Sequence, residues 1–117
     1  MKELENANVL VTGGAGFVGG NLVRRLLDLN AGSVHIVDNL LSAERSNVPG
    51  DARVYFTHGS IADDSVLAGL SDEYDYIFHL STYHGNQSSI HDPLADHENN
   101  LLTTLKLFER VKEFKRI

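Results

Sequence analysis

The sequence contains no cysteine and only two prolines among its 117 residues. Without cysteine the chain can form neither a disulfide scaffold nor a thiolate metal site, and it has no cysteine nucleophile. It also lacks an apolar run of about 20 residues, the length that a membrane-spanning helix requires. The charged start Met1–Glu5 has no apolar stretch typical of a secretory signal. We therefore expect a cytoplasmic protein with no membrane partner.

Positive charge is also scarce, because ten Lys and Arg side chains stand against sixteen Asp and Glu, for a net charge of −6. A nucleic-acid partner would require the opposite sign, and no local cluster of basic residues provides it. The hydrophobic content of 42% is enough for one packed core and excludes a disordered tail. We expect a single domain over residues 1–117, without nucleic acid as a partner.

Short apolar runs that end in turn residues alternate with stretches of helical period. The runs predict four strands, at 8–12, 34–38, 54–56 and 76–80. The helical stretches predict three helices, at 17–29, 63–70 and 93–115, with mainly loop over 39–51 and 81–92. In the last helix the apolar residues recur at steps of three and four, which predicts a core stripe of Leu101, Leu105, Phe108 and Val111.

This alternation predicts an α/β fold, a partial Rossmann domain with a doubly wound parallel sheet in strand order 3-2-1-4. The ligand edge then lies at the carboxyl ends of the strands, between the first and the fourth. The sequence stops where a fifth strand should begin, so we expect a sheet truncated before strand 5. Strand 76–80 becomes an exposed apolar edge, and we expect self-association through it.

Three glycines, Gly13, Gly16 and Gly19, lie three residues apart between the first strand and the first helix. In a dinucleotide fingerprint the first permits a tight turn, the second lets the backbone approach a pyrophosphate, and the third lets helix and strand pack closely. The unbonded N–H groups at the helix start would face the anion. A plain glycine turn is the alternative, but a strand before and a helix after favour dinucleotide binding.

An acidic residue, Asp38, ends the second strand 19 residues after Gly19, where a carboxylate would accept hydrogen bonds from an adenosine ribose. Its charge would repel a 2′-phosphate and so favours NAD over NADP. Arg45 keeps NADP open, since a nearby arginine can bind that phosphate. The alternative is that Asp38 only begins a turn.

Six histidines raise the question of a metal, and four of them lie in the second half of the chain. His79, His84, His91 and His97 are separated by five, seven and six residues, so none forms the i, i+4 pair that chelates well on a helix. We therefore expect no metal site. At a strand end, His79 is expected to be a core histidine bonded to the backbone.

Taken together, these motifs resemble the extended short-chain dehydrogenase/reductase family, and in particular its NAD-dependent nucleotide-sugar epimerases and dehydratases, among them UDP-glucose 4-epimerase-like enzymes. The resemblance spans essentially the whole chain. It rests on five segments in the order typical of the family: 12–19, 38–45, 59–61, 79–81 and 93–104.

The resemblance implies a set of NAD-contacting residues. Those near the phosphates and the adenosine would be Gly13, Gly16, Phe17, Val18, Asp38, Asn39, Ser42, Ala43, Ser60 and Ile61. Those on the nicotinamide side would be Leu80, Ser81, Thr82, His84 and Asn99. Three features depart from the family pattern: Ser60 replaces an aspartate beside the adenine, larger residues replace small alanines from Leu80 onward, and His84 stands where relatives place a lysine.

No catalytic residue is predicted, because the family's Tyr-x-x-x-Lys pair is missing from this sequence. The residues four positions after the four tyrosines are Gly59, Phe78, Leu80 and Gln87. In the family, that tyrosine removes a proton from a sugar hydroxyl while hydride passes to NAD and back. We therefore expect the N-terminal, NAD-binding part of an enzyme that acts on a nucleotide sugar, able to bind NAD but not to catalyse.

Two alternatives remain at this point. The chain could be a non-catalytic NAD-sensing module that regulates a partner, or a flavodoxin-like or receiver-type interaction domain. A receiver would place acidic residues at the end of the first strand, where this chain has Thr12 and Gly13. Relatives often dimerise through two helices per subunit, and helix 93–115 would supply one of them, so a homodimer is a further expectation.

Overall fold

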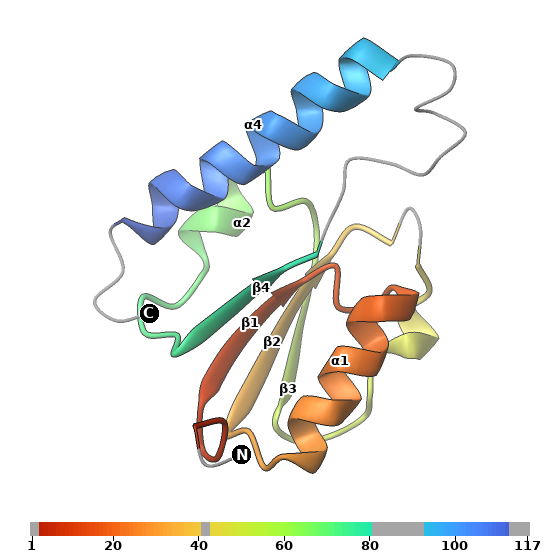
Figure 1. The fold of residues 1–117 in the computed structure, drawn as a ribbon, viewed down its shortest axis with the longest axis vertical. Coiled ribbons are helices and arrows are strands. Elements are labelled where there is room, and N and C mark those ends of the chain that lie inside the picture. The colour runs from red at the N-terminus through yellow and green to blue at the C-terminus, as the bar shows by residue number, and fades with distance from the viewer. Residues whose placement is uncertain (1–2, 41–42, 81–92, 113–117) are drawn as a thin grey trace.

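A computed structural model describes residues 3–40, 43–80 and 93–112, and its centre is a parallel sheet of four strands (Figure 1). The strands are β1 (Asn8–Thr12), β2 (Ser33–Asp38), β3 (Val54–His58) and β4 (Tyr76–His79). Their order is β3-β2-β1-β4, and all three neighbouring pairs are parallel. The predicted partial Rossmann fold and its strand order are confirmed.

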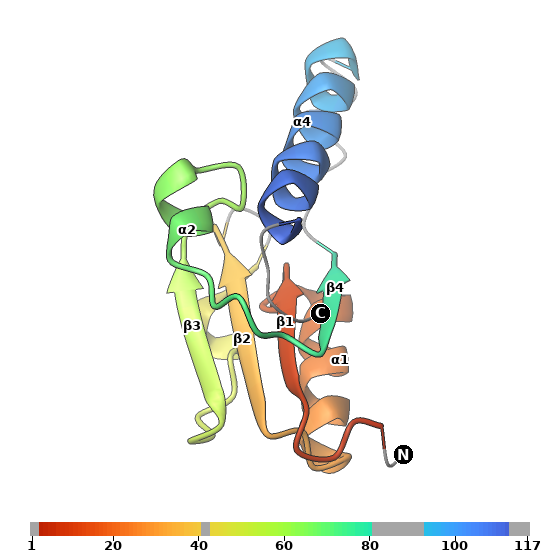
Figure 2. The ribbon, with the colours of Figure 1, turned by 90° about the vertical axis from the view of Figure 1, so that its left-hand side faces the viewer.

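Helices cover both faces of this sheet. They are α1 (Phe17–Asp28), α2 (Asp64–Ala68) and α4 (Pro93–Val111), with a short 3-10 helix η1 (Arg45–Asn47) between β2 and β3. The helix α1 lies on one side, and α2 and α4 lie on the other (Figures 1 and 2). The predicted helices 17–29, 63–70 and 93–115 exist with shorter bounds, and η1 falls in a segment expected to be mainly loop.

Alternation along β1 divides the core into two clusters, because successive side chains of a strand point to opposite faces. Val9 and Val11 pack with the apolar side of α1, where Val23 and Leu26 are buried. Leu10 faces the other way and packs in a cluster that includes residues of α2 and α4. Burying apolar surface stabilises a fold by about 25 cal/mol per Å². Both clusters therefore help to hold the helices against the two faces of the sheet.

The buried face of α4 differs from the predicted stripe. Leu105 is 51% exposed and Phe108 57% exposed, whereas Leu107 is 1% exposed and Thr103 is buried. The helix carries apolar residues on more than one face, so spacing alone does not decide which face meets the sheet. The prediction that Leu105 and Phe108 belong to the core is wrong, and the side chain of Leu101 lies outside the described residues.

A polar residue of β2, His35, is accommodated by a small hydrogen-bond network. Its Nδ1 lies 2.8 Å from the Tyr74 hydroxyl and its Nε2 lies 2.8 Å from Thr57 Oγ1. The Tyr74 oxygen also accepts from the Ser71 backbone N–H at 3.2 Å. Burial lowers the pKa of His35 and raises the pKa of Tyr74, and so favours the neutral form of both groups.

Among the strands that the structure describes, β4 forms one edge of the sheet, next to β1. Tyr76 is exposed at the start of this strand, while Ile77 and Phe78 are half-buried. Pairing of this edge with another chain stays a prediction. Within the described residues, no helix is long and apolar enough to cross a membrane.

Candidate cofactor-binding site

The glycine turn lies at the carboxyl edge of the sheet, between β1 and α1 (Figure 1). Gly13 has a φ of 76°, in the left-handed region that side chains disfavour. Its N–H donates to the Val37 carbonyl at 2.8 Å, and its carbonyl accepts from the Gly16 N–H at 3.2 Å. A glycine at position 13 therefore lets the chain reverse sharply while it stays attached to β2.

The other two fingerprint glycines have different surroundings. A Cβ on Gly19 would overlap the Gly13 carbonyl oxygen and lie 2.9 Å from the Gly14 Cα, so α1 packs against the turn with no space for a side chain. A Cβ on Gly16 would meet nothing closer than the Gly13 oxygen at 3.5 Å. No described residue fills the space at Gly16, as expected of a place where a ligand approaches the backbone.

The first residues of α1 are exposed to solvent. Gly16 is the N-cap, and no side chain among the described residues caps it. The first hydrogen bond of the helix is donated by the Gly20 N–H to the Gly16 carbonyl at 2.7 Å. The N–H groups that precede Gly20 in the helix therefore take no part in its i to i−4 hydrogen bonds. Phe17 and Val18 are 85% and 66% exposed. Such a helix start, with its positive dipole end, suits a pyrophosphate.

The carboxylate of Asp38, at the end of β2, faces the same turn. It is only 8% exposed. One oxygen, Oδ2, accepts from the Ala15 N–H at 3.1 Å, and the other, Oδ1, accepts from the Leu40 N–H at 2.8 Å. Leu40 has a φ of 63°, a strained conformation for a residue with a branched side chain. These bonds fix the carboxylate and leave lone pairs on both oxygens for hydroxyl donors.

Beyond β2, the segment around Asp38 makes contact with β3. The Asn39 carbonyl lies 3.2 Å from His58 Nε2. The Arg45 guanidinium lies over the Phe56 ring, 4.5 Å from its centroid, a cation–π contact. Arg45 is thus engaged by an aromatic ring, which weakens the interpretation that it binds a 2′-phosphate.

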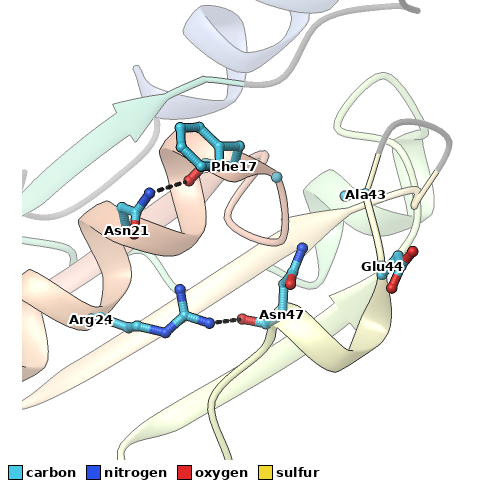
Figure 3. A pocket seen from close by; sticks show the side chains of 7 residues that line it. Phe17, Asn21, Arg24, Ala43, Glu44 and Asn47 are labelled. Atoms are coloured by element: carbon cyan, nitrogen blue, oxygen red, sulfur yellow. Dashed lines mark hydrogen bonds between the residues drawn. The ribbon is translucent and has the colours of Figure 1, made fainter.

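A pocket of about 670 Å³ opens beside the helix start (Figure 3). It lies between α1, as far along the helix as Arg24, and residues 43–47, which include η1. Its lining combines four polar or charged side chains with the Phe17 ring and the Ala43 methyl group, and consists of Gly16, Phe17, Asn21, Arg24, Ala43, Glu44 and Asn47. Ala43, predicted near the ribose, therefore lines the same pocket as two of the predicted pyrophosphate contacts.

On the other side of β1, three side chains form a bridge between the strands and α4. His79 Nδ1 lies 2.6 Å from Thr12 Oγ1, and His79 Nε2 lies 3.2 Å from Thr104 Oγ1. Thr12 Oγ1 also accepts from the Leu80 N–H at 3.1 Å. Burial lowers the pKa of His79. The expectation that His79 bonds to the backbone is wrong, because its partners are two threonine hydroxyls.

The predicted adenine residues lie after β3. Ser60 Oγ accepts from the Ala62 N–H at 3.1 Å, so the hydroxyl that replaces the family's aspartate already stabilises the local turn. Ile61 is buried in the core cluster that contains Leu10 and Leu67. Its side chain serves packing in this structure.

The structure brings together the glycine turn, Asp38, Asn39 and Leu80 at one sheet edge. Ser42, Ser81, Thr82 and His84 lie outside the described residues, as does the side chain of Asn99. In the described part of the chain there is no group of three or more histidine, aspartate or glutamate side chains that could hold a metal. Sequence reasoning missed Asn47, whose amide reaches the Ala15 carbonyl, because a lone asparagine in a polar loop carries no distinctive signal.

The fold and the turn define the dinucleotide-binding half of a Rossmann-type α/β domain. The model of the NAD dependent epimerase/dehydratase family matches residues 9–116, and the chain belongs to this family.

Relatives within the family include both kinds of enzyme in its name. The chain is 31% identical over 109 residues to a UDP-glucose 4-epimerase of Streptococcus mutans, covering 91% of this chain and 32% of that protein. It is 32% identical over 112 residues to dTDP-glucose 4,6-dehydratase 1 of Escherichia coli, covering 91% and 31%. The chain therefore spans about a third of the length of the curated relatives it matches.

Among solved structures, the Bordetella bronchiseptica enzyme WbmF in complex with NAD+ is similar to this chain with a TM-score of 0.90 and 70% identity. That match covers 97% of this chain and 34% of WbmF. UDP-glucose 4-epimerase of Thermotoga maritima, with UDP-glucose, has a TM-score of 0.80 at 31% identity, covering 93% and 35%.

Proposed function

We propose that this chain is the NAD-binding part of a nucleotide-sugar epimerase or dehydratase and that it binds NAD without converting a sugar by itself. The observation that carries the proposal is the open first turn of α1 facing the fixed carboxylate of Asp38. The first supplies N–H donors and a dipole for the pyrophosphate, and the second supplies acceptors for the adenosine ribose hydroxyls. NAD, when bound, would accept and return a hydride.

The comparisons support the choice of ligand and of substrate class. Structures of WbmF contain NAD+, NADH, or NAD+ with UDP. The UDP-glucose 4-epimerase and the dTDP-glucose 4,6-dehydratase among its relatives match this chain over about a third of their length. A nucleotide-activated sugar is therefore the proposed substrate of the whole enzyme. The NAD contacts expected from the sequence, at Gly13, Gly16, Phe17, Val18 and the other residues named there, are part of the same proposal.

The test is calorimetric titration of the 117-residue chain with NAD and with NADP. NAD should bind more tightly, because the carboxylate of Asp38 would repel a 2′-phosphate. Asp38→Asn should lower the affinity for NAD by roughly 10- to 100-fold, the usual effect of losing a hydrogen bond to a charged group. Asp51→Asn is the matched control, since Asp51 pairs with Arg53 just before β3, at the opposite end of the sheet. Equal affinities for NAD and NADP, or no heat with either, would contradict the cofactor assignment.

The catalytic half of the proposal has its own test. The chain with NAD and UDP-glucose or dTDP-glucose should yield no altered sugar, because none of its tyrosines is followed by a lysine four residues later. Conversion that persists through purification and in Tyr83→Phe would show that the chain is catalytic. NAD affinity that changes only when a partner protein is added would favour the NAD-sensing alternative.

A further inference from the structure

One residue of the glycine turn is held from both sides by side chains of other segments. Ala15 is fully buried. Its N–H donates to Asp38 Oδ2 at 3.1 Å, and its carbonyl accepts from Asn47 Nδ2 at 2.9 Å. The turn that precedes α1 is therefore attached to the end of β2 on one side and to η1 on the other.

Asn47 is itself fixed by its backbone. Its N–H donates to the Glu44 carbonyl at 3.0 Å within η1, and its carbonyl lies 3.5 Å from Arg24 Nη2 on α1. In Figure 3 the amide of Asn47 rises from η1 on the side of the pocket that faces the turn before Phe17, while Arg24 reaches the main chain of Asn47. The donor is thus directed by two elements rather than by a free loop.

We propose that Asn47 is a positioning residue for the cofactor's pyrophosphate, an inference that rests on the proposed function and extends it. The Ala15 carbonyl belongs to the same planar peptide group as the Gly16 N–H. The Gly16 N–H donates to the Gly13 carbonyl on one side of this peptide, and the Asn47 amide holds its carbonyl on the other. The two bonds together set the plane of the peptide that enters the N-cap, from which the first turn of α1 continues. Donors that are already aimed at the ligand cost less ordering when it binds.

Loss of the Asn47 amide has a defined consequence at this turn. The Ala15 carbonyl is buried and would lose a partner, and the peptide plane between Ala15 and Gly16 would be held only by the bond from the Gly16 N–H to the Gly13 carbonyl, at 3.2 Å. Asp38 would still hold the N–H side of Ala15. The adenosine half of the site would therefore keep its acceptor, whereas the pyrophosphate half would lose its alignment.

The experiment compares Asn47→Ala and Asn47→Asp with the control Ser46→Ala in the 117-residue chain. Ser46 lies in the same 3-10 turn, and its hydroxyl is bonded to the exposed Glu44 carboxylate at 3.3 Å. Asn47→Ala should lower the affinity for NAD by roughly 3- to 10-fold, as expected for one lost hydrogen bond. An aspartate has the same shape as asparagine, but Asn47→Asp places a carboxylate against the Ala15 carbonyl, so it should lower the affinity for NAD further. Ser46→Ala should bind as the unaltered chain does.

A second readout separates positioning from general loosening of the fold. In NMR titrations, Asn47→Ala should weaken the binding of ADP, which carries a pyrophosphate, but leave the affinity for adenosine within about twofold of that of the unaltered chain. In the free chain, the Gly16 amide resonance should shift in both Asn47 variants and not in Ser46→Ala. Equal losses for ADP and adenosine, or NAD affinities unchanged in both Asn47 variants, would overturn the proposal.

The two hypotheses fail in different ways. If the unaltered chain binds no NAD, the proposed function is wrong, and the Gly16 resonance then decides whether Asn47 sets the turn. A Gly16 resonance that moves no more in Asn47→Ala than in Ser46→Ala overturns the positioning role whatever the chain binds. If Asn47→Ala does not fold, the isosteric Asn47→Asp provides the same comparison.

Discussion

The closest backbone approach in the site yields a prediction about folding stability that does not depend on any ligand. In Gly19→Ala the new methyl group would overlap the Gly13 carbonyl oxygen and lie 2.9 Å from both the Gly13 carbonyl carbon and the Gly14 Cα. All three atoms belong to the backbone, so no side chain can move aside. Relief requires α1 to shift away from the turn, which also disturbs the packing of Val23 on β1.

The magnitude follows from two opposing effects. Overpacking a fitted site costs about 1–3 kcal/mol, and a clash with backbone belongs at the upper end of that range. Alanine in a helix interior recovers at most about 1 kcal/mol relative to glycine. We therefore expect Gly19→Ala to lower the free energy of unfolding by about 2 kcal/mol.

The neighbouring glycine gives a matched control with the opposite sign. A Cβ on Gly20 would be 3.5 Å from Arg24 Nη1 and 3.8 Å from the Gly14 carbonyl oxygen, ordinary contact distances. Gly20→Ala should therefore raise the free energy of unfolding by about 0.5–1 kcal/mol. Urea denaturation followed by far-UV circular dichroism measures both variants. The packing argument is refuted if Gly19→Ala proves as stable as Gly20→Ala.

Three further predictions concern α4, β2 and the turn before β3. Leu107→Ala should lower the free energy of unfolding by about 2–5 kcal/mol, because Leu107 is 1% exposed. Leu105 is half-exposed, so Leu105→Ala should change it by less than about 0.5 kcal/mol. Denaturant unfolding of the two variants compares the two faces of α4 directly. Burial lowers the pKa of His35, so the unfolded state binds more protons than the folded state once the pH falls through 6.5. The free energy of unfolding should therefore decrease as the pH falls through that value. An NMR titration that places the His35 midpoint above 6.5 would contradict this. Hydrogen bonds from Arg53 lower the pKa of Asp51 to about 2. In an NMR titration of the carboxyl carbon, Arg53→Ala should return this pKa toward 3.8. A midpoint that is the same in both chains would mean that the pair does not form in solution.

Local signals in the sequence were sufficient for most of the fold. Each strand is a short apolar run ended by a turn residue, and α1 begins at the residue after a glycine N-cap, so alternation and spacing located both. The strand order was expected from the alternation of strands and helices, whose connections are long enough for parallel pairing, as in a doubly wound sheet. The signals for each strand and helix lie in residues close together in the chain, and for that reason they could be read without coordinates.

Features that depend on tertiary contacts could not be derived in this way. The buried face of α4 is set by the contacts of Leu107 with the sheet, and two overlapping apolar stripes made Leu105 an equally good candidate. The two partners of His79 come from β1 and α4, elements separated by most of the chain. Asn47 acquires its role only because η1 lies beside the turn at Ala15.

The order of the strands also has a consequence for how the chain assembles. Val9 pairs with Val34 of β2, 25 residues away, and with Tyr76 of β4, 67 residues away. Closing the longer loop costs about 1 kcal/mol more in chain entropy. We therefore expect β1, α1 and β2 to join early in folding and β4 to dock late. Pulse-labelled hydrogen exchange should protect amides between β1 and β2 before those between β1 and β4.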